Sequence, residues 1–160
     1  MDTFELTGHE VVINKNPFSS PINVDVFTTL LRIKNPRLTK TIVVSRKTSS
    51  IAYISDRMGV GFLVENELNL VIRCSLYLRT KKKNNDEPEL PYRGRLVLFG
   101  NELVNPVREK TLLNQYHSNF QGRMALGAKV SLYYTTWMEY VHIIGFSFNM
   151  SKSEPHGKIA

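Results

Sequence analysis

Hydrophobic and polar residues alternate most regularly between residues 68 and 79 of the chain. Apolar side chains stand at every second position there, namely Leu68, Leu70, Ile72, Cys74, Leu76 and Leu78. Because successive side chains of a strand point to opposite faces, this period predicts a strand with one buried and one solvated face. The solvated face would carry Arg73, Tyr77 and Arg79. We expect the next apolar run, residues 95–100, to pair with this strand as a hairpin.

Shorter apolar runs predict further strands on either side of this segment. They cover residues 10–13, 40–47, 50–55, 129–135 and 140–150. The last two are expected to form a hairpin, and the residues that share one face of its second strand are Tyr140, His142, Ile144, Phe146 and Phe148. The glycine pair at residues 59 and 61 lacks the third glycine and the helix cap of a phosphate-binding loop, so we interpret it as a turn or bulge.

Two segments carry the start and stop signals of helices. In the first, Ser20-Pro21 is expected to supply the N-cap and the first helical residue, and Asn35-Pro36 ends the helix. Its apolar stripe consists of Val24, Phe27, Leu30 and Leu31. In the second, Asn105-Pro106 is expected to supply the cap and the first helical residue. Its apolar edge consists of Leu112, Leu113 and Tyr116.

These elements predict a single domain of the α+β class, with a mainly antiparallel sheet packed by two helices. A chain of 160 residues with no internal repeat and no break in composition favours one compact core. Residues 10–150 are assigned to this globular domain. Residues 1–9 are expected to be a flexible N-terminal segment, and residues 151–160 a flexible polar tail.

The chain is strongly basic. Lys and Arg number 21 against 14 Asp and Glu, which gives a formal net charge of +7. Such an excess favours an anionic partner, such as nucleic acid or an acidic membrane surface, although ordinary solubility charge gives the same total. The first ten residues lack the basic and apolar regions of a signal peptide, and no apolar run reaches the roughly 18–20 residues that span a bilayer. We therefore expect a soluble or peripheral protein.

The residue types that carry catalysis show no catalytic spacing. Cys74 is the only cysteine, and it lies on the apolar face of its predicted strand, where burial makes a thiol unreactive. The histidines show no close metal-binding spacing. Asp86, Glu87 and Glu89 follow a run of lysines and are interpreted as local charge balance. We expect a protein that is not an enzyme, with no cofactor, no metal site and no small-molecule substrate.

Basic residues gather in two stretches and on the polar face of the main strand. The residues expected to contact nucleic acid or membrane are Arg37, Lys40, Arg46, Lys47, Arg73, Arg79, Lys81, Lys82 and Lys83. Near an acidic membrane each basic residue contributes about 1 kcal/mol, so the lysines of residues 81–83 contribute roughly 3 kcal/mol. That is weak for one copy, and function would need several copies in an assembly. The loop around them, residues 78–96, is explained almost equally well as the polar end of a hairpin.

The segment "VVINKNPFSSPINVDVFTTLLRI" resembles the opening of the globular domain of rhabdovirus matrix proteins. The matching pattern is a short strand, a polar Asn-x-Pro-Phe turn and an amphipathic helix with Asp-Val, and its residues here are Asn16, Pro17, Phe18, Asp25 and Val26. The main match covers residues 10–33. A weaker similarity to the same family is the stretch "YHSNFQGR", residues 116–123. The chain has neither the long basic N-terminal tail nor the Pro-Pro-x-Tyr motif of many matrix proteins, and contains only Pro91-Tyr92. It is closer to a short form, as in plant-infecting rhabdoviruses.

The resemblance implies a viral matrix-like structural protein without enzymatic activity. Such a protein self-associates, binds the viral nucleocapsid or its RNA, and links it to an anionic membrane. It would be found in the virion and in the host-cell cytoplasm, peripheral at the membrane, with the nucleus as a further location. The alternative is a viral accessory protein, such as a movement protein or silencing suppressor, that binds RNA nonspecifically.

Overall fold

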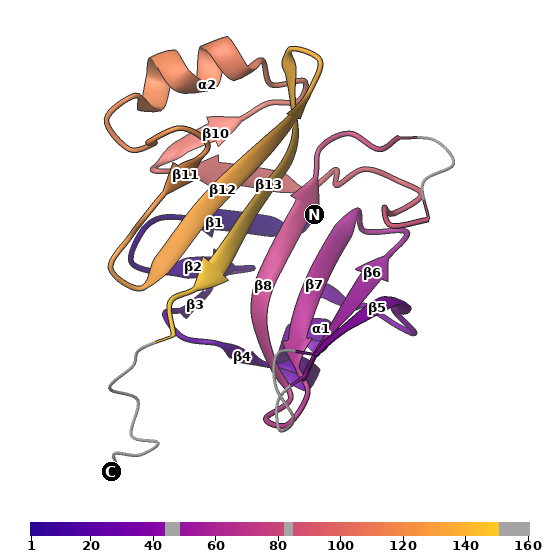
Figure 1. Cartoon of the computed structure of the whole chain (residues 1–160). Helices are drawn as coiled ribbons and strands as arrows, with labels where there is room; N and C mark the ends of the chain where they lie inside the picture. Colours follow the sequence, from indigo (N-terminus) through magenta and orange to yellow (C-terminus); the bar gives the residue numbers. More distant parts are fainter. Residues whose placement is uncertain (44–48, 82–84, 151–160) are drawn as a thin grey trace.

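The computed structural model describes residues 1–43, 49–81 and 85–150, and its strands form two sheets, one behind the other (Figure 1). The eight-stranded sheet runs in the order β11 (Met124–Ala125), β12 (Val130–Trp137), β13 (Tyr140–Phe148), β8 (Leu70–Tyr77), β7 (Val60–Glu65), β6 (Ser49–Ser55) and β5 (Arg37–Val43), and β4 (Ile22–Asn23) pairs with β8. The five-stranded sheet runs in the order β10 (Asn101–Leu103), β9 (Arg95–Leu98), β1 (Thr3–Leu6), β2 (Val11–Ile13) and β3 (Asn16–Phe18).

The hydrophobic core lies between the two sheets. Phe4 of β1 contacts Phe146 of β13 with ring centres 6.2 Å apart, and both side chains are fully buried. Phe4 also meets the ring of Tyr92 edge-on at 5.6 Å. Burying an aromatic side chain of this size stabilises the fold by roughly 1.5–3 kcal/mol. The inner face of the eight-stranded sheet is therefore occupied, and its other face, called the outer face below, is turned away from the core.

The prediction of an α+β fold was wrong. Strands make up 48% of the described residues and helices 11%. The helices, α1 (Val24–Leu31) and α2 (Glu109–Tyr116), have eight residues each. Helices that short cannot cover a sheet this wide, and the second sheet covers its inner face instead.

The N-terminal residues also differ from the prediction of a flexible segment. Residues 1–9 contain β1, which is the central strand of the five-stranded sheet. It pairs antiparallel with β2 and parallel with β9, and Phe4 and Leu6 are fully buried. A four-residue strand has too short a pattern to be recognised when most of its stability comes from distant partners.

The pairing predicted for the main strand was wrong as well. Residues 95–100 contain β9, which pairs with β1 and β10 and not with β8. The neighbours of β8 are β7 and β13. The predicted hairpin of residues 129–135 and 140–150 is confirmed, because β12 and β13 pair antiparallel along their length. Its buried face includes Ile144, Phe146 and Phe148, as expected. The expectation that Tyr140 shares this face was wrong, because the bulge at His142 turns Tyr140 to the outer face.

A β-bulge explains why the alternation of residues 68–79 was only partly predictive. Leu63 of β7 pairs with Arg73 and the next residue, Val64, pairs with Val71, so Ile72 is the extra residue. A bulge shifts every residue beyond it to the other face. Before the bulge, the buried residue is accordingly Val71. Leu68, Leu70 and Ile72, which were predicted to be buried, are not. Beyond the bulge the prediction was correct, and the buried residues are Cys74, Leu76 and Leu78.

Both helices begin later than predicted. The side chain of Asn23 caps α1 by accepting hydrogen bonds from the backbone N–H groups of Asp25 (2.9 Å) and Val26 (3.3 Å). Arg32, in the left-handed conformation, ends this helix. Before α2, the side chain of Asn105 does not cap the helix but donates a 2.7 Å hydrogen bond to the carbonyl of Leu78. No helix within the described ranges is long and apolar enough to cross a bilayer.

We predict that Phe4→Ala lowers the free energy of unfolding by about 3–5 kcal/mol, because it leaves a cavity between the sheets. Urea denaturation would measure the change. Glu5→Ala is the matched control, since Glu5 is the next residue of β1 and is only half-buried. A loss below about 1 kcal/mol for Phe4→Ala would show that β1 does not pack in the core.

Candidate functional site

Two tyrosine rings lie against the backbone of the outer face. The register pairs Gly61 of β7 with Ser75 of β8, and Ser75 with Gly145 of β13. A Cβ atom added to Gly61 would lie 3.2 Å from the Tyr77 ring, and one added to Gly145 would collide with the Tyr133 ring. The hydroxyl groups of Tyr133 and Ser75 are hydrogen-bonded to each other. The glycines thus leave room for the rings to pack against the sheet backbone. Aromatic rings on an open sheet face can serve as stacking platforms.

Positively charged side chains lie against aromatic rings along the same face. The guanidinium of Arg73 is 5.7 Å from the centre of the Tyr133 ring. Further along, Arg79 lies 4.9 Å from the Trp137 ring centre and 5.0 Å from that of Tyr140. Arg79 also donates a 3.1 Å hydrogen bond to the carbonyl of Trp137. Cations in such positions are attracted by the negative face of the ring.

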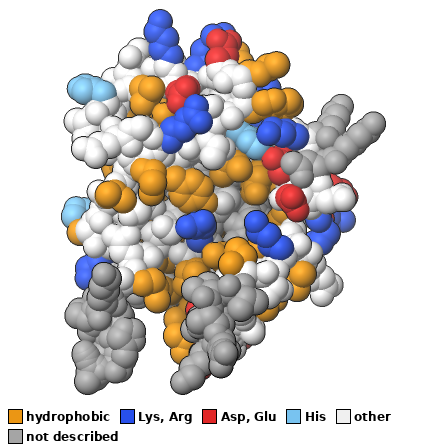
Figure 2. Space-filling view, in the orientation of Figure 1, with side chains coloured by type: hydrophobic (Ala, Val, Ile, Leu, Met, Phe, Trp, Pro, Cys, Tyr) orange, Lys and Arg blue, Asp and Glu red, His pale blue; other side chains and the backbone are white. Residues whose placement is uncertain are grey.

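Two more cations extend this arrangement. The ammonium group of Lys81 is 5.7 Å from the Trp137 ring centre, and the guanidinium of Arg108 is 5.2 Å from that of Tyr140. We call the whole set the cation–aromatic track, and its members are Arg73, Tyr77, Arg79, Lys81, Arg108, Tyr133, Trp137 and Tyr140. Figure 2 views the outer face and shows Lys and Arg side chains set around a band of hydrophobic side chains.

Most cations of the track have no acidic partner. Within the described residues, no carboxylate forms an ion pair with Arg73, Arg79 or Lys81. Arg108 pairs with Glu139 at 3.1 Å, and both side chains are more than half exposed. Exposed pairs of this kind contribute little to stability and leave the charges accessible. Arg73, Arg79 and Lys81 therefore lie beside aromatic rings of the outer face without an ion pair in the described part of the chain.

Arg37, which was predicted as a contact residue, anchors the loop that carries the lysines. Its guanidinium pairs with both carboxylate oxygens of Asp56 at 3.0 Å. It also donates hydrogen bonds to the backbone carbonyls of Asn85 (2.6 Å) and Glu87 (3.1 Å). The hydrogen bond from Arg37 holds the pKa of the Asp56 carboxyl below its usual value. The donors of this arginine are thus engaged within the protein.

A buried acid–base pair holds the other side of this loop. Glu87 and His142 are 7% and 4% exposed, and Oε2 of Glu87 lies 3.0 Å from Nε2 of His142 without the alignment of a hydrogen bond. The second oxygen of Glu87 accepts a 2.8 Å hydrogen bond from the backbone N–H of Lys81. His142 is the extra residue of a bulge between β12 and β13. Glu87 is therefore a structural anchor, and the interpretation as local charge balance was wrong for it.

The predicted contact residues thus fall into different groups. Arg73, Arg79 and Lys81 lie together on the cation–aromatic track. Lys40 is exposed and shares their face, because the register Lys40, Ala52, Leu63, Arg73 runs straight across β5 to β8. The predicted residues that lie outside the described part of the chain are Arg46, Lys47, Lys82 and Lys83.

Sequence reasoning missed Trp137, Tyr140 and Arg108 as members of the site. Trp137 and Arg79 are 58 positions apart, so only the pairing of β13 with β8 brings them together. The local signal was a lone tryptophan beside the turn of a predicted hairpin. Two other tyrosines belong to the hydrophobic core or pack against it. Tyr92 is only 4% exposed, and Tyr53 stacks on the core residue Phe62.

Burial raises the pKa of two side chains of β8. Burial, with Glu87 nearby, raises the pKa of Tyr77 to about 12, so its hydroxyl stays neutral at pH 7. Burial also raises the pKa of the Cys74 thiol, which keeps it protonated. Among the described residues, no group of three or more His, Cys, Asp or Glu side chains is placed to hold a metal ion.

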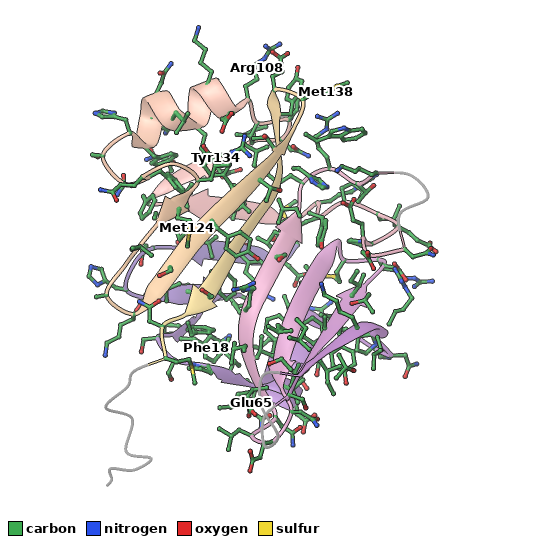
Figure 3. All side chains as sticks on the ribbon, viewed as in Figure 1. Phe18, Glu65, Arg108, Met124, Tyr134 and Met138 are labelled. Atoms are coloured by element: carbon green, nitrogen blue, oxygen red, sulfur yellow. The ribbon has the colours of Figure 1, made fainter. Side chains whose placement is uncertain are left out.

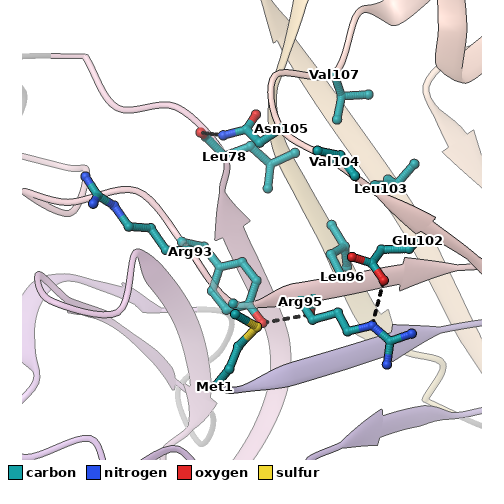
Figure 4. A pocket seen from close by; sticks show the side chains of 12 residues that line it. Met1, Leu78, Arg93, Arg95, Leu96, Glu102, Leu103, Val104, Asn105 and Val107 are labelled. Atoms are coloured by element: carbon teal, nitrogen blue, oxygen red, sulfur yellow. Dashed lines mark hydrogen bonds and ion pairs between the residues drawn. The ribbon is translucent and has the colours of Figure 1, made fainter.

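A hollow lies at the edge of the five-stranded sheet, apart from the cation–aromatic track (Figure 4). It has a volume of about 340 Å³, and Arg95 and Glu102 in its wall form a 2.7 Å ion pair. The hydroxyl of Tyr92 hydrogen-bonds to the carbonyls of Arg95 (2.9 Å) and Asp2 (3.1 Å). Arg95 and Glu102 therefore neutralise each other's charge, and Arg93 is a further cation that lines the hollow.

Comparisons with known proteins leave the family open. No family model matches the chain, and neither a curated protein nor a solved structure is significantly similar to it. The resemblance to rhabdovirus matrix proteins therefore stays a hypothesis, and the candidate site rests on its own geometry.

We predict that Asp56→Asn lowers the free energy of unfolding by about 1 kcal/mol at pH 7, a modest value because the pair is partly exposed. The pKa of Asp56 is lowered by folding, so its contribution is present above the unfolded pKa of about 3.9 and is lost as the pH falls through the folded pKa. The difference between wild type and variant should therefore shrink below about pH 4.

Urea denaturation at a series of pH values measures this difference. Glu102→Gln is the control, because its pair with Arg95 is about half exposed on both sides and should contribute little. A difference for Asp56→Asn that stays constant down to pH 3 would contradict the proposed pairing.

Proposed function

We propose that this protein binds single-stranded nucleic acid, foremost RNA, on the outer face of its eight-stranded sheet, without catalysing a reaction. The observation that carries the proposal is the cation–aromatic track, in which Arg73, Arg79 and Lys81 lie against aromatic rings and have no acidic partner within the described ranges. Proteins that bind single strands combine a positive surface that follows the phosphates with aromatic rings on which bases stack.

The length of the track suits a short stretch of nucleotides. Arg73 and Arg79 are six residues apart along β8 and its extension, which corresponds to roughly 20 Å at about 3.3 Å per residue. Single-strand-binding folds cover about 4–16 nucleotides per domain, and this track matches the lower end of that range. A single copy would bind weakly, so several copies along one strand would be needed for stable binding.

The same chemistry argues for binding that does not depend on base sequence. The track presents guanidinium and ammonium groups, which contact phosphates, and ring faces, which stack on any base. Neutralising each phosphate of a single strand lowers the salt slope, log K against log salt, by about 0.7. Contacts from Arg73, Arg79 and Lys81 would therefore give a slope of about −2.

A second candidate function is the attachment of RNA to an anionic membrane by a self-associating, matrix-like protein. The observation that favours it is Met138, which is 81% exposed in the turn between β12 and β13. Figure 3 shows Met138 and Arg108 at the same end of this hairpin. An exposed apolar side chain next to tryptophan and arginine also suits the interface of a bilayer, where each cation contributes about 1 kcal/mol.

We predict that Arg73→Gln/Lys81→Gln weakens binding of a fluorescent 15-nucleotide oligouridine by roughly tenfold or more, because it removes two charged contacts of on the order of 1 kcal/mol each. The salt slope should become less steep by about 1.4. Fluorescence anisotropy across a salt series measures both. Lys15→Gln/Lys110→Gln is the matched control, since both lysines are exposed and lie on the β2–β3 turn and on α2.

Equal losses in both double variants would mean that only net charge matters, and the proposed site would be wrong. No binding of oligouridine by the wild type at low salt would contradict the function itself. Vesicles that contain phosphatidylserine separate the second candidate. If the wild type binds vesicles but not oligouridine, and Met138→Glu abolishes vesicle binding, membrane attachment replaces nucleic-acid binding.

A further inference from the structure

A depression in the outer face lies beside the Tyr77 ring, away from Trp137. Its volume is about 260 Å³, and β5, β6, β7 and β8 all contribute to it. Its lining includes Lys40, Ala52, Gly61, Arg73, Tyr77 and Asp86. Pockets for drug-sized ligands measure roughly 300–1,000 Å³, so this one is sized for a smaller unit.

The depression exists because small residues are placed next to each other in the sheet. Ala52 of β6 stands between Lys40 and Leu63 in one row across the sheet. Gly61 stands in the next row of the same face, between Ile54 and Ser75. Gly61 has no side chain and Ala52 has only a methyl group, and larger side chains on neighbouring strands form the rim.

The rim carries charge at two separated points. Lys40 and Arg73 stand in one row with two strands between them, which places their Cα atoms roughly 14 Å apart at about 4.8 Å per strand. Both side chains are long enough to reach a ligand that lies between them, and Arg73 would turn from the Tyr133 ring to do so. No described acid forms an ion pair with either of them.

The remaining wall groups fit the other parts of a nucleotide. The Tyr77 ring is packed against Gly61 and lines the depression, where it can contact a base. The carboxylate of Asp86 also lines the depression, and its negative charge repels phosphate. A nucleotide would therefore be oriented with its phosphate toward Lys40 and Arg73.

We propose that this depression is a subsite for one nucleotide of the bound strand, with the base against Tyr77 and the phosphate between Lys40 and Arg73. The inference rests on the proposed nucleic-acid binding and adds a place where a single unit is held. It predicts that a free nucleoside monophosphate binds at this position by itself.

The test uses uridine monophosphate, uridine and inorganic phosphate as probes, followed by backbone amide NMR on the full chain. Uridine monophosphate should shift the amides of Leu63, Arg73 and Tyr77 in a saturable way. Uridine or phosphate alone should need concentrations at least about tenfold higher, because each supplies only part of the contacts.

Two variants examine the shape and the charge of the subsite separately. Ala52→Leu fills the depression and keeps every cation, so it should weaken uridine monophosphate binding at least about tenfold. Lys40→Gln should weaken uridine monophosphate but leave uridine unchanged. Ser147→Leu is the matched control for Ala52→Leu, because Ser147 pairs with Arg73 on the side away from the depression and is also half-buried.

The outcomes separate this subsite from the proposed function. If oligouridine binds but uridine monophosphate produces no saturable shifts, or Ala52→Leu leaves them unchanged, the subsite is wrong and nucleic-acid binding stands. If phosphate alone reproduces the shifts at equal concentration, the depression is only an anion site. If oligouridine does not bind either, both proposals fail.

An unchanged thermal midpoint of Ala52→Leu shows that the variant is folded, and Lys40→Gln tests the site without changing its packing.

Discussion

The packing of the five-stranded sheet on the inner face of the eight-stranded sheet is the contact on which the rest of the structure depends. Phe4 and Phe146 meet at its centre, and both are fully buried. Because one face of the large sheet is used for this core, only its outer face is open to a ligand. That face carries two glycines covered by tyrosine rings and a series of cations, of which Arg73, Arg79 and Lys81 form no ion pair with any acid in the described part of the chain. The architecture therefore separates stability, between the sheets, from binding, on the outside.

The loop between β8 and β9 is held from both sides, which changes how its lysines are understood. Arg37 fixes it through Asp56 and two backbone carbonyls, and the buried pair of Glu87 and His142 fixes it against β13. The polar end of a hairpin, which was one explanation of this loop, would be exposed and would not be held by such contacts. Lys81, the described lysine of this loop, is thereby placed beside Trp137. The loop thus belongs to the same surface as the cations of β8.

How much could be predicted depends on whether the deciding contact is local. The alternation of β8 correctly placed Arg73, Tyr77 and Arg79 on the open face, because a strand's period is a property of the chain itself. The alternation predicted the wrong face for the residues that precede Arg73, because the bulge at Ile72 is set by the pairing with β7. The helix limits failed for a similar reason, since Asn23 and not Ser20 caps α1 where β4 pairs with β8. The role of Trp137 and the strand β1 depend on residues far away in sequence, which no local pattern records.

The most direct measurement of the central claim is an NMR titration of aromatic side-chain resonances with oligouridine. Binding on the outer face predicts saturable shifts for Tyr77, Tyr133 and Trp137, and none for the inner-face rings of Phe4 and Phe146. Ring-current changes from stacked bases would make these shifts larger than those produced by an equal concentration of phosphate. Saturable shifts confined to residues off the outer face, such as those of α2, or no shifts at all, would contradict the account.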